Sequence, residues 1–353
     1  MKTVPTLTII IATYNSEKTL QKVLVSIHRQ TYPLSKMEIL IIDGGSTDAT
    51  RNIAKSYMCR IIDNPKMLPS WAKFLGYKAS RGVYAMFLDS DEVIESSRSI
   101  ERKIRVLQNN SSVHAVTGSG YISPKQYPFF NSYINEFGDP FSFFIYRLSK
   151  DNRFFVDAMI KKYPTVHNDP DHVVFNFSDS IDLPIFELAA MGSMVDLVYL
   201  KTHFPEILKN PGLIWHIFNL LVSKKTHIAI IKHDPLMHFS AETPGKYFGK
   251  ITSRIIRNVF TEAKEGFKGR DEFSMGMNRY KKFLFIPYSL SILMPCIDSA
   301  YLSLTRHDIR YFVHIPLCLY TSFLILYYMI LKMFGVQPVF KSYGESKPIY
   351  QSI

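Results

Sequence analysis

Short apolar runs alternate with segments of helical periodicity through the first hundred residues of this 353-residue chain. The apolar runs that suit strands occupy residues 7–12, 38–43, 60–62 and 83–88. Apolar positions recur at helical spacing over residues 20–27, and a second helical segment covers residues 71–80. Strands that alternate with helices predict an α/β fold with a mixed, mostly parallel sheet flanked by helices. Such sheets bind ligands at the carboxyl ends of their strands.

The pattern changes after residue 118. Residues 121–183 contain many Phe and several Pro residues but no clean period, which favours an inserted irregular region over a sheet-forming core. Residues 246–270 then place basic side chains around apolar positions at helical spacing. A basic amphipathic helix of this kind is typical of a membrane surface.

Two strongly apolar stretches follow, at residues 283–297 and 311–334. The second has no charged residue before Lys332, and its length suffices to cross a bilayer core of about 30 Å. The first contains two prolines and spans a membrane only if it extends to about Leu304. A kinked membrane hairpin is the preferred interpretation. Helices that lie in the membrane plane or re-enter it, and buried helices of a soluble domain, are the alternatives.

Composition adds charge and compartment to this picture. The net charge of +12 and the isoelectric point near 9.4 indicate an anionic partner, such as a phosphate-bearing substrate, anionic lipid or nucleic acid. The basic residues cluster beside apolar segments, which favours lipid over nucleic acid. Three scattered cysteines suit a reducing compartment, and the first apolar run is too short for a signal peptide. We therefore expect the folded part of the chain to face the cytoplasm.

Three polar motifs follow predicted strands. Asp89-Ser90-Asp91 comes after the fourth strand, and two carboxylates one residue apart suit a hard cation such as Mg²⁺ or Mn²⁺. Thr13-Tyr14-Asn15 follows the first strand, and Asp43-Gly44-Gly45-Ser46-Thr47-Asp48 follows the second. Carboxylates, hydroxyls and helix N-terminal amides at such positions are suited to a base and a ribose. The alternatives are a surface turn for the first motif and helix capping by Ser46 or Asp48 for the last.

Together, and in this order, the motifs resemble those of the family 2 glycosyltransferases over about residues 6–110. The resemblance implies a GT-A fold, a nucleotide-diphospho-sugar donor, a divalent metal and usually inversion at the anomeric carbon. It implies a nucleoside pocket lined by Thr13, Tyr14, Glu17 and Asp43, with Asp89 near the ribose or metal and Asp91 on the metal. The remaining motif residues expected at the nucleotide are Asn15, Gly45, Ser46 and Ser90.

Two departures from the family pattern concern the phosphates and the catalytic base. Where the family tends to show Arg, this chain has Lys73, which meets a phosphate as a point charge without a bidentate fork. An inverting transfer needs a carboxylate that takes the proton of the acceptor, and the usual Glu-Asp pair is absent after Glu206. The nearest candidates are Glu206 and Asp196, with Asp179, Asp182 and Glu187 upstream. An acceptor that is already anionic, such as a lipid phosphate, would need no base.

His238 lies where related enzymes often place a histidine after a late strand, so it is a candidate ligand of the metal or the diphosphate. A packed core histidine is the alternative. Lys250, Arg254 and Arg257 follow it and suit diphosphate or lipid headgroups, or else form a solvated helix face.

The sequence thus predicts a metal-dependent glycosyltransferase that acts on a lipid-linked or lipid-phosphate acceptor at the cytoplasmic membrane face. Residues 1–245 form the GT-A domain, with a nucleotide-binding half at 1–118 and an acceptor half at 119–245. Residues 246–280 form an interfacial segment, and residues 281–353 form an apolar membrane segment of two helices with a short tail. A polysaccharide synthase and a catalytically inactive membrane scaffold are the alternative functions.

Overall fold

The computed structural model describes residues 5–180, 183–184, 186–260, 276–336 and 338. Three expectations therefore fall partly or wholly outside the described residues. They concern the carboxylate of Asp182, the second part of the basic segment at residues 261–270, and the tail from residue 339 onward.

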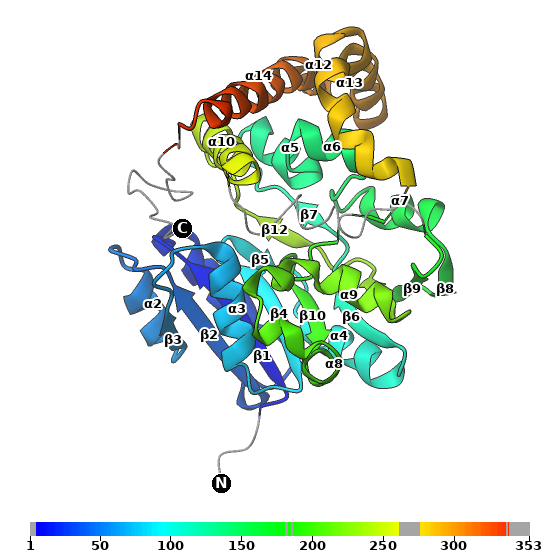
Figure 1. The fold of residues 1–353 in the computed structure, drawn as a ribbon. Coiled ribbons are helices and arrows are strands. Elements are labelled where there is room, and N and C mark those ends of the chain that lie inside the picture. Colours follow the sequence, from blue (N-terminus) through cyan, green and yellow to red (C-terminus); the bar gives the residue numbers. More distant parts are fainter. Residues whose placement is uncertain (1–4, 181–182, 185, 261–275, 337, 339–353) are drawn as a thin grey trace.

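A nine-stranded sheet forms the lower half of the molecule (Figure 1), in the order β3-β2-β1-β4-β10-β6-β11-β9-β8. The strands are β1 (Leu7–Thr13), β2 (Met37–Asp43), β3 (Arg60–Asp63), β4 (Tyr84–Asp89), β6 (Val113–Thr117), β8 (Thr165–Asn168), β9 (His172–Asn176), β10 (Ser193–Asp196) and β11 (His227–Ile231). Among these strands only β10 and β9 run against the direction of the others. The predicted mixed, mostly parallel sheet is therefore confirmed.

The central strands are apolar because helices cover both faces of the sheet. Every residue of β1 except Ala12 is buried, and so is every residue of β4 except Asp89. The helices of this part are α1 (Glu17–His28), α2 (Thr50–Ser56), α3 (Pro69–Ala79), α4 (Ser99–Asn109), α7 (Phe155–Lys162), α8 (Leu197–His203) and α9 (Ile217–Ser223). In α3, Gly76 allows a close approach to β1, since a Cβ there would overlap the side chain of Ile10.

A second sheet of three short strands stands at the carboxyl ends of the first. It consists of β5 (Glu92–Ile94), β12 (Leu236–His238) and β7 (Tyr121–Ile122), with β12 in the middle. In its register His238 lies opposite Glu92. This small sheet therefore brings a histidine from late in the chain next to the turn that follows β4.

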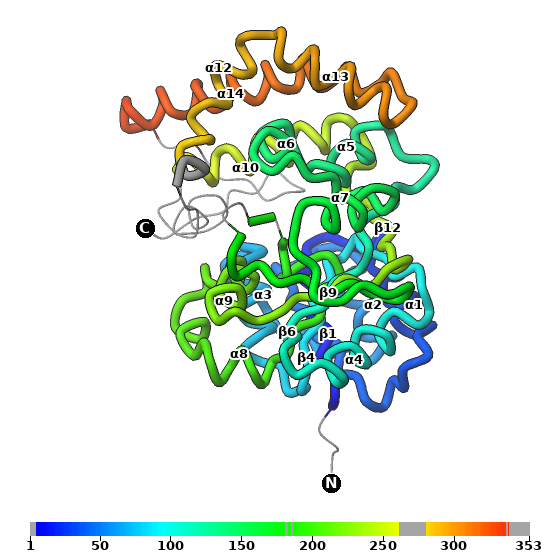
Figure 2. The backbone as a smooth tube through the Cα atoms, turned by 90° about the vertical axis from the view of Figure 1, so that its right-hand side faces the viewer, coloured from blue at the N-terminus to red at the C-terminus, as the bar shows by residue number. Residues whose placement is uncertain are grey.

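Six of the described helices form a separate layer above the carboxyl ends of the large sheet (Figures 1 and 2). They are α5 (Phe129–Phe137), α6 (Pro140–Tyr146), α10 (Pro244–Phe260), α12 (Phe285–Leu290), α13 (Leu293–Arg306) and α14 (His314–Met333). Their buried side chains form two clusters distinct from the core of the sheet. The Phe-rich stretch supplies α5 and α6, whose rings pack against much later residues, as Phe143 does on His314 and Phe144 on Phe285.

Buried polar contacts fix the C-terminal helices to the rest of this layer. The ring of His314 is hydrogen-bonded to the hydroxyls of Tyr133 and Tyr288. On α13, Arg306 donates to the fully buried Glu136 of α5 at 2.9 Å. The contacts of Tyr133 and Glu136 join residues that lie more than 150 positions apart, so α13 and α14 are integral parts of the layer.

The C-terminal helices also pass tests of length and apolar composition for membrane spans. The helix Ile309–Met333 is long and apolar enough to cross a membrane, and only 28% of its most apolar window is buried. The pair Tyr280–Leu290 and Leu293–Arg306 passes together but bends by 90° at its break. Both apolar stretches of the sequence are therefore helical.

Candidate functional site

Asp43 ends β2 with its side chain fully buried among hydrogen-bond donors. Its Oδ1 accepts from Thr13 Oγ1 at 3.0 Å and from Ser46 Oγ at 2.5 Å. Its Oδ2 accepts from the amides of Gly45 and Ser46 at 3.2 and 3.0 Å, and from Arg51 Nη1 at 3.0 Å. Burial alone would raise the pKa of Asp43, but the bonds from Ser46, Arg51 and Thr13 outweigh it and lower that pKa. Asp43 is therefore an ionised group that fixes the loop after β2.

The loop after β1 is bonded to the loops that follow its two neighbouring strands. The amide of Asn15 donates to Ser46 Oγ at 2.9 Å, and Asn15 Oδ1 accepts from the amide of Thr47 at 2.9 Å. On the other side, Ser16 Oγ lies 2.9 Å from Ser90 Oγ in the turn after β4. The three loops of the predicted nucleotide site thus form one connected edge.

Glu17, Asp48 and Tyr14 complete this edge. Glu17 Oε2 accepts from the amide of Ala49 at 3.0 Å, and its own amide donates to Asp48 Oδ2 at 3.1 Å. The Tyr14 side chain lies over Gly44, where an added Cβ would be 3.4 Å from Tyr14 Cδ2. Asp48 therefore fixes helix starts, as the capping interpretation proposed, whereas Ser46 bonds to Asp43.

Asp89 is the last residue of β4, and its carboxylate is ion-paired with Lys73 from α3. The Lys73 side chain is buried, and the ring of Trp215 lies 5.7 Å from its Nζ. The amide of Asp89 donates to Glu92 Oε2 at 3.0 Å, and Tyr121 donates to Glu92 Oε1 at 2.6 Å. Burial, followed by the charge of Asp89, raises the pKa of Glu92. The predicted phosphate ligand Lys73 thus lies beside the predicted metal ligand Asp89.

Asp91 lies between an imidazole and an ammonium group. Its Oδ1 is 3.5 Å from His238 Nε2, and its Oδ2 is 3.7 Å from Lys250 Nζ. Burial would raise the pKa of Asp91, but its interactions with His238 and Lys250 outweigh burial and hold that pKa well below its usual value. The His238 ring stacks on Tyr121, and the amide of Phe239 donates to the Asp91 carbonyl at 2.9 Å. The structure therefore brings together Asp91, His238 and Lys250, which the sequence predicted only as separate candidates.

Asp196 lies at the opposite edge of the sheet, so it is removed as a candidate base. Strand β10 is antiparallel to β4 and places Asp196 opposite Tyr84, the first residue of β4. The five-residue step from Tyr84 to Asp89 corresponds to about 17 Å. Asp196 instead accepts from the amide of Tyr199 at 2.9 Å, which caps α8, and from His114 Nδ1 at 3.1 Å. It has a structural role there.

The other predicted base, Glu206, is exposed on a 3₁₀ turn (Pro205–Leu208). Burial, followed by the charge of Glu206, raises the pKa of Tyr77 near the end of α3. Glu187 is better placed. Since β10 runs antiparallel to β4, the residues before it continue toward Asp89, and the Met191 amide donates to Glu92 Oε1 at 3.2 Å. In the sequence, Glu187 stands out only because it precedes β10. Its approach to Asp89 follows from the antiparallel direction of β10, which the sequence does not show.

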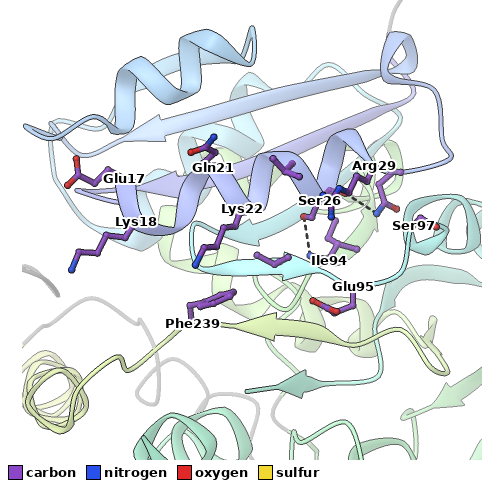
Figure 3. Close-up of a pocket in the computed structure, with 13 residues that line it drawn as sticks. Glu17, Lys18, Gln21, Lys22, Ser26, Arg29, Ile94, Glu95, Ser97 and Phe239 are labelled. Carbon is purple, nitrogen blue, oxygen red and sulfur yellow. Dashed lines mark hydrogen bonds between the residues drawn. The ribbon is translucent and has the colours of Figure 1, made fainter. Parts of the chain in front are cut away.

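A cavity of about 530 Å³ lies on the outer side of α1, next to β5 (Figure 3). Glu17 and Lys18 line one end, Arg29 and Ser97 line the other, and Lys22 lies 4.6 Å from the ring of Phe239. Of the residues predicted for the nucleotide and metal, only Glu17 lines it. This cavity therefore adjoins the edge at Glu17, but Asp89 and Asp91 do not line it.

Comparison with known proteins identifies the family. The profile described as glycosyl transferase family 2 matches residues 8–176, which contain all three strand-end motifs. Residues 8–176 therefore form a glycosyltransferase family 2 region. It is 35% identical to glycosyltransferase AglE of Haloferax volcanii over 95 residues, which cover 25% of this chain and 31% of that protein.

Two further comparisons show how far the likeness extends. The poly(ribitol-phosphate) beta-N-acetylglucosaminyltransferase TarS of Staphylococcus aureus is 26% identical over 118 residues, 32% of this chain and 21% of that protein. The chain thus matches less than a third of the length of AglE and TarS. The solved mannosyltransferase PcManGT from Pyrobaculum calidifontis, in complex with GDP-Man and Mn²⁺, has a TM-score of 0.52 at 13% identity, covering 93% of this chain and 88% of that one. This likeness concerns the fold, and the predicted GT-A fold is confirmed.

Proposed function

We propose that this chain transfers a sugar from a nucleotide-diphospho-sugar that binds at the edge formed by the loops after β1, β2 and β4. The observation that carries the proposal is the connection of these three loops around the buried Asp43 carboxylate, with Asp89 and Asp91 beside it. Because the loops are already ordered by their own hydrogen bonds, a nucleotide would bind with little loss of loop freedom. The family match over the same residues supports this assignment.

The donor set at this edge fits Mg²⁺ or Mn²⁺. Asp89 and Asp91 offer carboxylate oxygens, and His238 offers an imidazole nitrogen beside Asp91. When bound, the cation would neutralise charge that develops on the departing diphosphate. Asp91 is ionised at neutral pH because its pKa is lowered. Lys73 and Lys250 add positive charge on either side, which would also favour the diphosphate.

Substitution of Asp91 tests this assignment. Asp91→Ala is expected to abolish metal-dependent transfer while leaving the fold intact. Its matched control is Asp179→Ala, an exposed carboxylate three residues after β9, which ends opposite His227 at the start of β11 and so at the other edge of the sheet. The assay measures hydrolysis and transfer from several nucleotide-sugars with membrane extract as acceptor. Full activity of the Asp91 variant would refute the mechanism. Nucleotide binding by the wild type without turnover of any donor would favour the inactive scaffold.

We propose that Glu187 is the general base when the acceptor's nucleophile is a hydroxyl. Its side chain is 30% exposed, and its Oε2 lies 3.8 Å from Lys150 Nζ. Burial, followed by the charges of Glu92, Asp89 and Glu187, raises the pKa of Tyr121. Glu187→Gln is expected to slow transfer to a hydroxyl acceptor by about 10²- to 10⁴-fold, the usual contribution of a general base. Transfer to a lipid phosphate would fall less than about tenfold, because that nucleophile is already deprotonated. Unchanged transfer to a hydroxyl acceptor would exclude Glu187 as the base.

An exposed apolar surface supports a lipid-borne acceptor. Large apolar side chains of α13 and α14 are about half exposed or more, including Leu293, Ile297, Leu304, Phe323, Tyr327 and Met333. Contiguous exposed patches of this kind mark protein or membrane contact sites. We propose that this face lies in a membrane with the donor edge on its cytoplasmic side, where the three free cysteines would stay reduced.

The packing of α10 on α14 favours helices that lie along the membrane over the kinked hairpin preferred from sequence. Thr252 Oγ1 lies 3.0 Å from the Tyr320 hydroxyl, and Lys332 Nζ donates to the Val259 carbonyl at 2.6 Å. Between these two contacts α10 advances by about 10 Å and α14 by about 18 Å in the same direction, so the two helices lie side by side. Because α10 carries four basic residues, Lys246, Lys250, Arg254 and Arg257, a spanning α14 would draw these charges into the bilayer, which is costly.

Depth measurements distinguish the two arrangements. Trp is introduced singly at Phe323 and Met333 of α14, and quenching by brominated lipids is measured in vesicles that contain anionic lipid. Equal depths are expected for an in-plane helix, whereas a spanning helix would separate the two positions by about 15 Å. Val198→Trp, an exposed apolar position on α8, serves as the control that should not be quenched.

A further inference from the structure

A second group of metal-ligating side chains lies on the β8–β9 hairpin at the edge of the large sheet. His167 Nε2 is 2.9 Å from Asp169 Oδ2, and His172 Nδ1 is 3.2 Å from the same oxygen. The three candidate ligand atoms lie within 4.8 Å of one another. Among the residues that the structure describes, no other three His, Cys, Asp or Glu side chains meet this test, and Asp89, Asp91 and His238 do not.

The loop between the two strands holds the Asp169 carboxylate in a fixed orientation. Its Oδ1 accepts from the amides of Asp171 and His172, both at 2.7 Å. Lys232 Nζ donates to the Asp169 carbonyl at 2.5 Å and to Asn168 Oδ1 at 2.6 Å, so its charge is bonded to the loop away from Oδ2. Oδ2 is therefore left facing the two imidazoles.

We propose that His167, Asp169 and His172 bind a late first-row divalent cation of the Zn²⁺ type, with water as the remaining ligand. Two imidazoles and one carboxylate suit such ions better than Mg²⁺, which prefers an all-oxygen shell. Metal–ligand bonds of about 2.0–2.1 Å in a tetrahedral site place neighbouring ligand atoms about 3.3–3.4 Å apart. The two Oδ2-to-nitrogen separations of 2.9 and 3.2 Å are already close to this value.

The cation would fasten an edge hairpin that has few other contacts. All four residues of β8 are exposed, and this strand pairs only with β9. A metal that joins His167 at the end of β8 to His172 at the start of β9 closes the hairpin at its turn. Because the ion would bind the folded hairpin in preference to the unfolded chain, its binding stabilises the hairpin.

The test uses the tag-free full chain, stripped with a chelator and titrated with Zn²⁺ and, for its visible absorption, Co²⁺. Asp91→Ala is the background, so that a metal at the donor edge does not contribute. One Co²⁺ per chain with a tetrahedral absorption band is expected. His167→Gln with His172→Gln should weaken binding by more than about 100-fold, the upper range for loss of a group that only orients a ligand.

His203→Gln is the matched control, since this exposed histidine lies on α8 away from the hairpin. It should leave the Co²⁺ spectrum and the affinity unchanged. The exposed His167→Gln substitution alone should fold normally and leave sugar transfer unchanged. A Co²⁺ band that persists in the double variant, or an absence of binding in the Asp91→Ala background, would overturn the proposal without bearing on the donor site.

Discussion

Replacing Asp43 by Asn tests whether this buried carboxylate stabilises the donor edge. An asparagine oxygen at the Oδ2 position keeps its contacts to the amides of Gly45 and Ser46 and to Arg51, but without the negative charge. A hydrogen bond to a charged group contributes about 1 kcal/mol more than a neutral one. Three such fixed donors give an expected loss of about 3 kcal/mol in the free energy of unfolding. The hydroxyls of Thr13 and Ser46 can rotate to accept from the new amide.

Asp63 provides a matched control, because it bonds the same Arg51 Nη1, at 2.7 Å, but is 77% exposed. Asp63→Asn should therefore cost less than about 1 kcal/mol, as is usual for exposed ion pairs. Urea unfolding of both variants in the same detergent, with the midpoint and slope reported separately, measures the difference. Equal losses for the two variants would refute the reasoning.

The pH dependence of stability in the wild type and in Asp43→Asn gives an independent check. The folded pKa of Asp43 is lowered, so its contribution to stability is fully present above the ordinary Asp pKa of about 4. It is lost as the pH falls through the lower, folded pKa. The stability difference between wild type and Asp43→Asn should therefore be constant from pH 8 to about 5 and shrink below about 4. A difference that grows on acidification would contradict the assignment of Asp43 as an ionised group.

Two further substitutions test the core. Lys103→Met should lower the free energy of unfolding by about 3–5 kcal/mol, because it leaves the Asp234 carboxylate buried without its counter-charge. That carboxylate is 1% exposed and lies 2.7 Å from Lys103 Nζ. As a control, Arg105→Met breaks an exposed pair and should cost about 0.5 kcal/mol or less in the same urea titration. Gly76→Ala should cost about 1–3 kcal/mol by overpacking against Ile10, and Ile10→Ala in the same chain should reduce that cost, which a double-mutant cycle measures.

The first hundred residues were predictable because each strand and helix there is a local pattern. The predicted strands at residues 7–12, 38–43 and 83–88 match β1, β2 and β4 to within one residue at each end. Polar residues directly after them were expected at one edge, and the structure brings Thr13, Asp43 and Asp89 there. Parallel strands that alternate with helices determine the position of their carboxyl ends without further information.

The acceptor half was less predictable because its arrangement depends on strand direction and distant packing. The antiparallel course of β10 decides which of the candidate carboxylates reaches the donor edge: Glu187 approaches it and Asp196 does not. The Phe-rich stretch showed no period because its helices α5 and α6 bury their rings against α13 and α14 instead of against the sheet. No local pattern encodes such partners.

Helix α10 joins the donor edge to the apolar layer. In its first half, Lys250 lies 3.7 Å from Asp91. One turn further along the helix, Arg254 pairs with Asp139 at the start of α6. The second half of α10 packs along α14. Because a helix with its side chains is about 10 Å across, a membrane that covers α14 would lie about one helix away from the proposed metal ligands. A phosphate or sugar at headgroup depth would then reach the donor while its lipid tails stay in the bilayer. In the proposed arrangement the basic residues of α10 would lie between an anionic substrate and an anionic surface, which would explain them better than nucleic-acid binding would.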